Sequence, residues 1–262
     1  MLDIIVVGGG PAGVSAAITA RQRGKEVAVI SNDRTHSGLY KAREIGNYPG
    51  FPKITGRELS DKLTAHAESS GAQMIAGKVN AIMQSDGVFH VGYGAEILTS
   101  RRVILATGIV QTSLFPGEEE FLGRGVSYCA TCDGMLFRGK RVCVVCQSPE
   151  VEAEADFLES IGCDVTLVRP LDIRICGDTR VTSIFAGATE IKCDGVFIIR
   201  HTIAPGILVP GLEMKSGHIV ADSMGKTNIP GVFAAGDCTG TPYQIAKAAG
   251  EGQVAALSAV ES

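Results

Sequence analysis

Long hydrophobic runs are missing from this 262-residue chain, and none of its uncharged apolar stretches could span a bilayer. The first residues, Met1-Leu2-Asp3, also lack the basic region of a secretory signal peptide. Tryptophan is absent altogether. From these absences we expect a cytoplasmic protein without a membrane partner.

The chain also has no large excess of charge of one sign, because its formal net charge is only -4 at pH 7. This near-balance gives no reason to expect a nucleic-acid partner. The five histidines show no ligand spacing, so no metal site is predicted. With 45% apolar residues, the chain can still bury a substantial core in one large or two small domains.

The eight cysteines are expected to be thiols rather than a disulfide framework, with one exception. Cys129 and Cys132 are separated by two residues and followed directly by Asp133. Such a pair can close a small reversible disulfide, and the adjacent acid can move a proton during exchange. A structural thiol pair or half of a zinc site is the alternative, but zinc would need two more ligands. The pattern favours redox chemistry.

The other close pair, Cys143 and Cys146, lies in an apolar run that reads as a buried strand. Side chains three residues apart on a strand point to opposite faces. We therefore interpret this second pair as inert packing.

Glycine is abundant, at 33 residues, and its first cluster follows an apolar strand predicted over residues 3–7. The turn Gly8-Gly9-Gly10-Pro11-Ala12-Gly13 then leads into a helix over 14–20 and a second strand over 26–30. This order predicts a dinucleotide-binding βαβ unit, rather than a glycine-rich turn without a ligand.

Each glycine of that turn has a separate task in a dinucleotide site. Gly8 allows the tight turn, Gly10 lets a pyrophosphate approach the backbone, and Gly13 lets the helix pack against the strand. The helix N-terminus then faces the phosphates. The acid that usually binds the ribose is displaced, since Ser31 and Asn32 close the second strand; the ribose contact is therefore unassigned.

A second βαβ unit is predicted from a strand over 139–146, a helix over 150–161 and a strand over 164–168. Its turn, Cys146-Gln147-Ser148-Pro149-Glu150, contains no glycine. Side chains there would block a pyrophosphate, and Glu150 would place negative charge at the phosphate position. We expect no NAD(P)H binding at this turn.

Further turns follow apolar segments along the chain. Asn47–Pro52 is irregular, Ala106-Thr107-Gly108 ends a strand, and Gly236-Asp237 ends another before a helix predicted over 245–260. Each can border a cofactor, although a surface turn, a plain strand end and a turn aspartate are the alternatives.

In their order and spacing these motifs resemble the low-molecular-weight thioredoxin reductases over nearly the whole chain. The resemblance implies an α/β fold of two Rossmann-like three-layer nucleotide-binding-type domains, the second inserted in the first and lacking a functional nucleotide turn. Residues 1–111 with 223–262 would bind FAD. Residues 112–222 would form the inserted redox-disulfide domain, a vestigial NADPH domain. A homodimer is implied as well.

The resemblance also implies roles for single residues. Cys132 would face the flavin, Cys129 would attack a partner disulfide, and Asp133 would protonate the leaving thiolate. Asp237 would hold the ribityl or phosphate region. The residues expected to bind FAD are Gly8, Gly10, Pro11, Ala12, Gly13, Asn47, Ala106, Thr107, Gly108, Gly236, Asp237, Gln244, Ile245 and Ala246.

Two departures point to one branch of that family. Members that use NADPH have a second glycine turn and a basic cluster after the next strand, where this chain has Arg169-Pro170. The inserted domain also looks shorter than in those members. The chain is therefore similar to the pyridine-nucleotide-independent branch, which includes ferredoxin-linked flavin thioredoxin reductases.

The leading hypothesis is an FAD-dependent reductase of a thioredoxin-like protein disulfide, with electrons from reduced ferredoxin or another non-pyridine-nucleotide donor. Arg101-Arg102 and Lys41 with Arg43 are candidate ferredoxin contacts, although a solvated basic face is the alternative. Other hypotheses are a flavin-dependent dithiol oxidase, an NADPH-linked reductase with an atypical turn, and an electron-transfer flavoprotein whose cysteines are incidental. A second flavin or an aromatic side chain could stack on the FAD.

Overall fold

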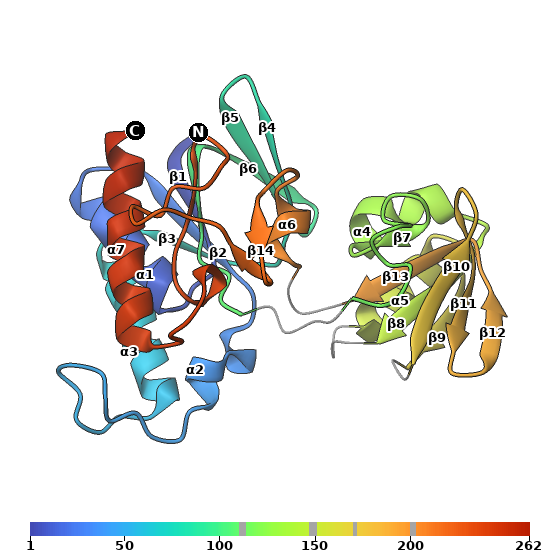
Figure 1. The fold of residues 1–262 in the computed structure, drawn as a ribbon, viewed down its shortest axis with the longest axis horizontal. Coiled ribbons are helices and arrows are strands. Elements are labelled where there is room, and N and C mark those ends of the chain that lie inside the picture. Colours follow the sequence, from blue (N-terminus) through green and yellow to red (C-terminus); the bar gives the residue numbers. More distant parts are fainter. Residues whose placement is uncertain (110–113, 147–150, 170–171, 200–202) are drawn as a thin grey trace. The chain divides into compact units, whose positions relative to one another are not determined.

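The computed structural model describes residues 1–109, 114–146, 151–169, 172–199 and 203–262, apart from the side chains of His36 and Cys132. The chain divides into two compact units, which are Met1–Val110 with Ala204–Ser262 and Gln111–Ile203 (Figure 1). One unit is thus inserted into the other. No helix within the described ranges is long and apolar enough to cross a membrane.

The segment 204–222, which the resemblance assigned to the inserted domain, belongs by its contacts to the first unit. The backbone N–H of Glu213 donates to Asn228 Oδ1, and Asn228 Nδ2 donates to the carbonyl of Gly211, both at 2.9 Å. The helix α6 (Pro205–Leu208) contacts β4 (Val79–Ser85) of the first unit. These long-range contacts could not be read from local sequence.

The first unit is built on a seven-stranded sheet with the order β3-β2-β1-β6-β5-β4, with β16 also paired to β6. The bounds are β1 (Leu2–Val7), β2 (Val27–Ser31), β3 (Gln73–Ala76), β4 (Val79–Ser85), β5 (Val88–Tyr93), β6 (Glu96–Leu105) and β16 (Val232–Ala234). The long strand β6 joins the parallel part of the sheet to its antiparallel part. Its start pairs antiparallel with β5, and its end pairs parallel with β1 and β16.

Three longer helices accompany this sheet: α1 (Pro11–Gln22), α3 (Gly56–Ser69) and α7 (Ile245–Glu261). A capping box starts α3, in which Thr55 Oγ1 accepts from the N–H of Glu58 and Glu58 Oε2 accepts from the N–H of Thr55. The remaining short elements are η1 (Arg34–His36), α2 (Gly38–Lys41), β14 (Met214–Lys215), β15 (His218–Ile219) and η3 (Asp237–Thr239).

The second unit combines a four-stranded parallel sheet, β7-β13-β8-β9, with a three-stranded antiparallel sheet, β10-β11-β12. The bounds are β7 (Val126–Ser127), α4 (Ala130–Asp133), η2 (Gly134–Phe137), β8 (Arg141–Cys146), α5 (Val151–Ser160), β9 (Asp164–Val168), β10 (Ile173–Gly177), β11 (Val181–Ala186), β12 (Thr189–Lys192) and β13 (Gly195–Ile199). One face of β8 and β13 packs on α4 and α5 through a core that includes Val142, Val144, Leu158 and Phe197.

Both predicted βαβ units are present, as β1-α1-β2 and β8-α5-β9 with parallel strand pairs. The predicted α/β class with two nucleotide-binding-type units is confirmed. Residues 147–150, where the sequence has no glycine, lie outside the described residues. The absence of NAD(P)H binding there stays a prediction.

The helices α1 and α7 approach so closely that only glycine fits at their contact. A β-carbon at Gly252 would lie 2.0 Å from the carbonyl oxygen of Ala12. Gly13 is confined separately by the turn before α1, since a β-carbon there would lie 1.8 Å from the carbonyl oxygen of Gly8. Gly252 is buried, whereas Gly250, two residues earlier on α7, is exposed and has open space at its β-carbon position.

This pair of glycines gives a matched test of the helix contact. We expect Gly252→Ala to destabilise the FAD-loaded protein by about 1–3 kcal/mol, because its methyl group overpacks the contact. Gly250→Ala should stabilise the same helix by about 0.5–1 kcal/mol, because alanine loses less backbone entropy. Urea unfolding followed by circular dichroism measures both. Equal effects of the two substitutions would contradict the close packing.

Candidate functional site

The glycine turn after β1 leaves the N-terminus of α1 open. Gly8 has a φ of 112°, and a β-carbon there would lie 2.2 Å from the carbonyl oxygen of Ala106. Gly10 is the N-cap of α1, makes no side-chain cap, and has no atom within 4 Å of its β-carbon position. No described side chain caps the start of α1, so the N-terminus of this helix is available to a phosphate.

Three turns expected to touch the cofactor follow the carboxyl ends of three neighbouring parallel strands. Gly8 follows β1, Ala106-Thr107-Gly108 follows β6, and Gly236-Asp237 comes just after β16. In open α/β sheets, ligands bind at this edge. The fold therefore brings together residues that are more than 200 positions apart in the sequence.

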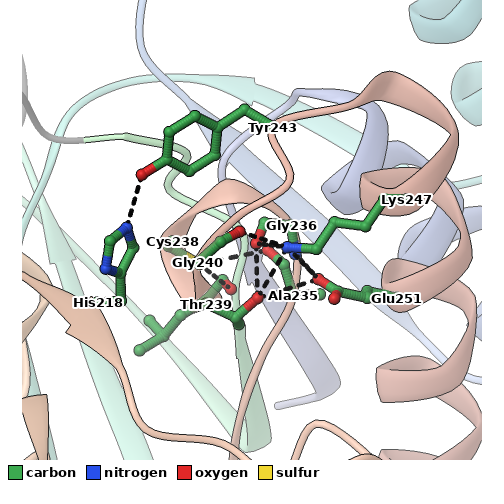
Figure 2. A network of polar contacts seen from close by, with 10 residues as sticks. His218, Ala235, Gly236, Cys238, Thr239, Gly240, Tyr243, Lys247 and Glu251 are labelled. Atoms are coloured by element: carbon green, nitrogen blue, oxygen red, sulfur yellow. Dashed lines mark hydrogen bonds and ion pairs between the residues drawn. The ribbon is translucent and has the colours of Figure 1, made fainter. Parts of the chain in front are cut away.

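The turn at Gly236–Gly240 is held by two side chains of α7 (Figure 2). Lys247 Nζ donates to the carbonyl oxygens of Gly236 at 3.0 Å and Gly240 at 2.7 Å. Glu251 Oε2 accepts from the N–H of Gly236 at 2.8 Å and from Thr239 Oγ1 at 3.0 Å. The two side chains pair with each other at 3.1 Å, so together they form a clamp on the backbone of this turn.

Asp237 lies within the clamped turn and keeps one carboxyl oxygen unsatisfied. Its Oδ1 is buried and has no hydrogen-bond partner. Burial raises the pKa of Asp237, Lys247 opposes this rise, and Glu251 adds to it. A buried carboxyl oxygen without a partner is costly unless a ligand completes it, so Asp237 is suited to bind a ligand hydroxyl.

The loop at Asn47–Pro52 and the start of α7 are joined by one hydrogen bond. Asn47 Nδ2 donates to Gln244 Oε1 at 2.9 Å. Gln244 is the N-cap of α7 and makes no side-chain cap, while Ile245 and Ala246 form the first turn. The predicted cofactor residues on these two segments are thus placed next to each other.

The cysteine pair lies in the second unit, between β7 and η2. Cys129 is half-buried and disulfide-bonded. Cys132 lies in α4, but its side chain is outside the described part of the structure. The pairing of Cys129 with Cys132 therefore stays a prediction.

Asp133 is tied to the backbone of Cys129 through Ser127. The hydroxyl Oγ of Ser127 donates to Asp133 Oδ2 at 2.7 Å and accepts from the N–H of Cys129 at 3.1 Å. On the neighbouring residue, the hydroxyl of Tyr128 donates to Oε1 of the fully buried Glu118 at 2.7 Å. The predicted acid is thus placed beside the redox motif.

The cysteines on the predicted strand behave as packing residues. Cys143 and Cys146 both lie on β8. Cys143 hydrogen-bonds Cys193, and this bond together with burial raises the pKa of Cys143. Cys146 packs against the core of the opposite face. Burial also raises the pKa of Cys163 and Cys238. High thiol pKa values disfavour the reactive thiolate.

No group of three or more metal-ligating side chains occurs among the described residues.

The model of the pyridine nucleotide-disulphide oxidoreductase family matches residues 2–184 and 172–252. The chain belongs to this family. It is 34% identical to the thioredoxin reductase of Treponema pallidum (strain Nichols), and the match covers 98% of this chain and 95% of that one.

Two solved structures extend the comparison. A ferredoxin-flavin thioredoxin reductase from Clostridium acetobutylicum is 40% identical, with a TM-score of 0.89, and the match covers 99% of this chain and 97% of that one. A thioredoxin reductase from Gloeobacter violaceus is 31% identical, with a TM-score of 0.80 and coverage of 99% and 93%. This member of the family is therefore a flavin disulfide oxidoreductase of the thioredoxin reductase type.

FAD is the cofactor of these flavoproteins, and the residues present here fit it. The open N-terminus of α1 suits the pyrophosphate, and the unsatisfied oxygen of Asp237 suits a hydroxyl group.

The residues that sequence reasoning missed are Ser127, Glu118, Lys247 and Glu251. The i, i+4 spacing of Lys247 and Glu251 was a signal for their pair, but nothing local indicated that it binds the Gly236–Gly240 backbone.

The clamp predicts an effect on cofactor affinity. We expect Lys247→Met to weaken FAD binding at least about tenfold, because the carbonyls of Gly236 and Gly240 lose their shared donor and the turn loosens. Flavin fluorescence during dialysis of the loaded protein measures the release of FAD. Lys226→Met removes a charge from an exposed site of the same unit and should leave the affinity unchanged; equal loss in both variants would contradict the clamp.

Proposed function

We propose that this flavoprotein reduces a protein disulfide of the thioredoxin type through Cys129 and Cys132, with electrons from a donor other than NADPH. Reduced ferredoxin is the donor that we favour. The observation that carries this choice is the similarity to the ferredoxin-flavin thioredoxin reductase. The sequence Cys146–Glu150 supports it, because a turn without glycine leaves no room for a pyrophosphate.

The proposed chemistry follows thiol–disulfide exchange. The thiolate of Cys129 attacks the partner disulfide and forms a mixed disulfide, while the leaving partner sulfur takes a proton from Asp133. Cys132 then attacks Cys129, which releases the second partner thiol and closes the enzyme disulfide. Bound FAD supplies the two electrons that reopen this disulfide.

An apolar surface beside the cysteine pair supports a protein rather than a small molecule as the partner. Met135 and Leu136 follow Asp133 after a single glycine, Gly134, and 58% and 69% of their surfaces are exposed. Large exposed apolar side chains next to a reactive group are suited to bind the surface of another protein. A homodimer, implied by the resemblance, is part of this proposal.

An NADPH-linked reductase with an atypical turn is the competing function, and the similarity to the Treponema pallidum thioredoxin reductase favours it. Anaerobic mixing of the oxidised protein with NADPH, NADH or reduced ferredoxin separates the two. We expect the flavin absorbance to bleach with ferredoxin alone, because the glycine-free turn excludes the nucleotide. Rapid bleaching by NADPH would establish the competing function. Cys129→Ser is the control, since its flavin should still bleach while disulfide reduction is lost.

The apolar surface predicts a difference between large and small substrates. Leu136→Ser should raise the KM for a protein disulfide about fivefold to tenfold, because a buried leucine is worth about 1–2 kcal/mol at an interface. Its kcat with a small aromatic disulfide should not change. Leu167→Ser is the matched control, because Leu167 is 51% exposed on β9 and outside the motif. A KM that rises equally in both variants would refute the docking role.

A further inference from the structure

The hydroxyl of Ser127 has two possible hydrogen-bond acceptors nearby but only one proton to donate. Its side chain is buried, and its Oγ lies 2.7 Å from Asp133 Oδ2, 3.1 Å from the amide nitrogen of Cys129 and 3.2 Å from the carbonyl oxygen of Cys129. The amide can only donate to the hydroxyl. The proton of Ser127 therefore has two acceptors to choose between, the carboxylate and the carbonyl.

The two choices correspond to the two protonation states of Asp133. While Asp133 is a carboxylate, the Ser127 proton points to Oδ2, and the short distance fits a charge-assisted bond. When Asp133 is protonated, its own proton points to Ser127 Oγ, and the Ser127 proton turns to the carbonyl of Cys129. The amide of Cys129 donates to Ser127 Oγ in both states, so the hydroxyl keeps one donor and one acceptor partner throughout.

A cavity of about 240 Å³ gives this pair a source of protons. Ser127 and Asp133 both line it, and three further charged side chains, Lys140, Arg180 and Asp194, lie on its wall. These three are exposed, so the cavity is connected to solvent on its polar side. A polar cavity of this size holds several water molecules.

We propose that Ser127 is a positioning residue that keeps Asp133 aimed at the cysteine pair in both protonation states, and that the cavity water returns the proton. This inference rests on the proposed function of Asp133 as the acid. When a thiolate leaves, it takes the proton of Asp133, and the Ser127 proton turns from the Cys129 carbonyl to the new carboxylate. A proton from solvent then returns to Asp133 through the cavity water, which takes up one proton as it passes on another.

The test compares two disulfides that differ in their need for a proton. The FAD-loaded full chain is reduced anaerobically with dithionite and mixed with cystine or with an aromatic nitrobenzoate disulfide across about pH 5.5–9. An alkyl thiolate leaves slowly unless it is protonated, whereas the aromatic thiolate is stable as it leaves. We expect Ser127→Ala to slow cystine reduction about tenfold and the aromatic reaction less than twofold.

Two further variants give measurements that mere loss of structure would not produce. Asp133→Asn should slow cystine reduction at least as much as Ser127→Ala and leave the aromatic reaction nearly unchanged, because it removes the proton donor itself. Ser127→Thr keeps the hydroxyl and should restore the rate of cystine reduction.

Flavin content and circular dichroism check that each variant folds, and Ser127→Gly replaces Ser127→Ala if the latter does not, with the same expected results. Ser160→Ala, at an exposed serine on α5, is the matched control and should behave as wild type. Equal slowing with both disulfides, or no recovery in Ser127→Thr, overturns the role of Ser127. The proposed function itself fails in a different way, if wild type reduces neither disulfide or Cys129→Ser remains active.

Discussion

The close approach of α7 to the first turn of α1 is the contact on which the first unit depends. It brings the C-terminal end of the chain against the N-terminal glycine turn, and a β-carbon at Gly236 would lie only 2.8 Å from that of Ala12. Turns that we expect to border the cofactor are thereby brought together from both ends of the sequence. This closure explains how a whole unit, Gln111–Ile203, can be inserted without separating the two halves of the site.

Both functional turns are held by side chains that hydrogen-bond to backbone atoms. In the first unit, Lys247 and Glu251 satisfy the carbonyls and the amide of the Gly236–Gly240 turn. In the second unit, Ser127 holds Asp133 beside the amide of Cys129. Turns lie outside the ladders of helices and sheets, so such bonds are what keeps their geometry constant. A site that exchanges electrons and protons needs the backbone geometry of its turns to stay the same while its charges change.

The second unit shows that a nucleotide-binding scaffold can persist without its glycine turn. The strands β8 and β9 and the helix α5 pair and pack as in the first βαβ unit. Burial of Val142, Val144, Leu158 and Phe197 supports this packing and does not require a bound nucleotide. Packing and ligand binding thus place separate demands on the same segment, and the packing demand is met without a glycine turn.

Local patterns were enough to predict both βαβ units and the helix α7, because strand runs, glycine turns and helical periodicity are properties of neighbouring residues. The placement of 204–222 with the first unit was decided by the tertiary structure, through the bonds between Asn228 and 211–213. The partners of Ser127 and Glu251 were decided there too. Their hydrogen bonds depend on how turns fold back in space, and side-chain chemistry alone does not specify which distant backbone atom comes within 3 Å.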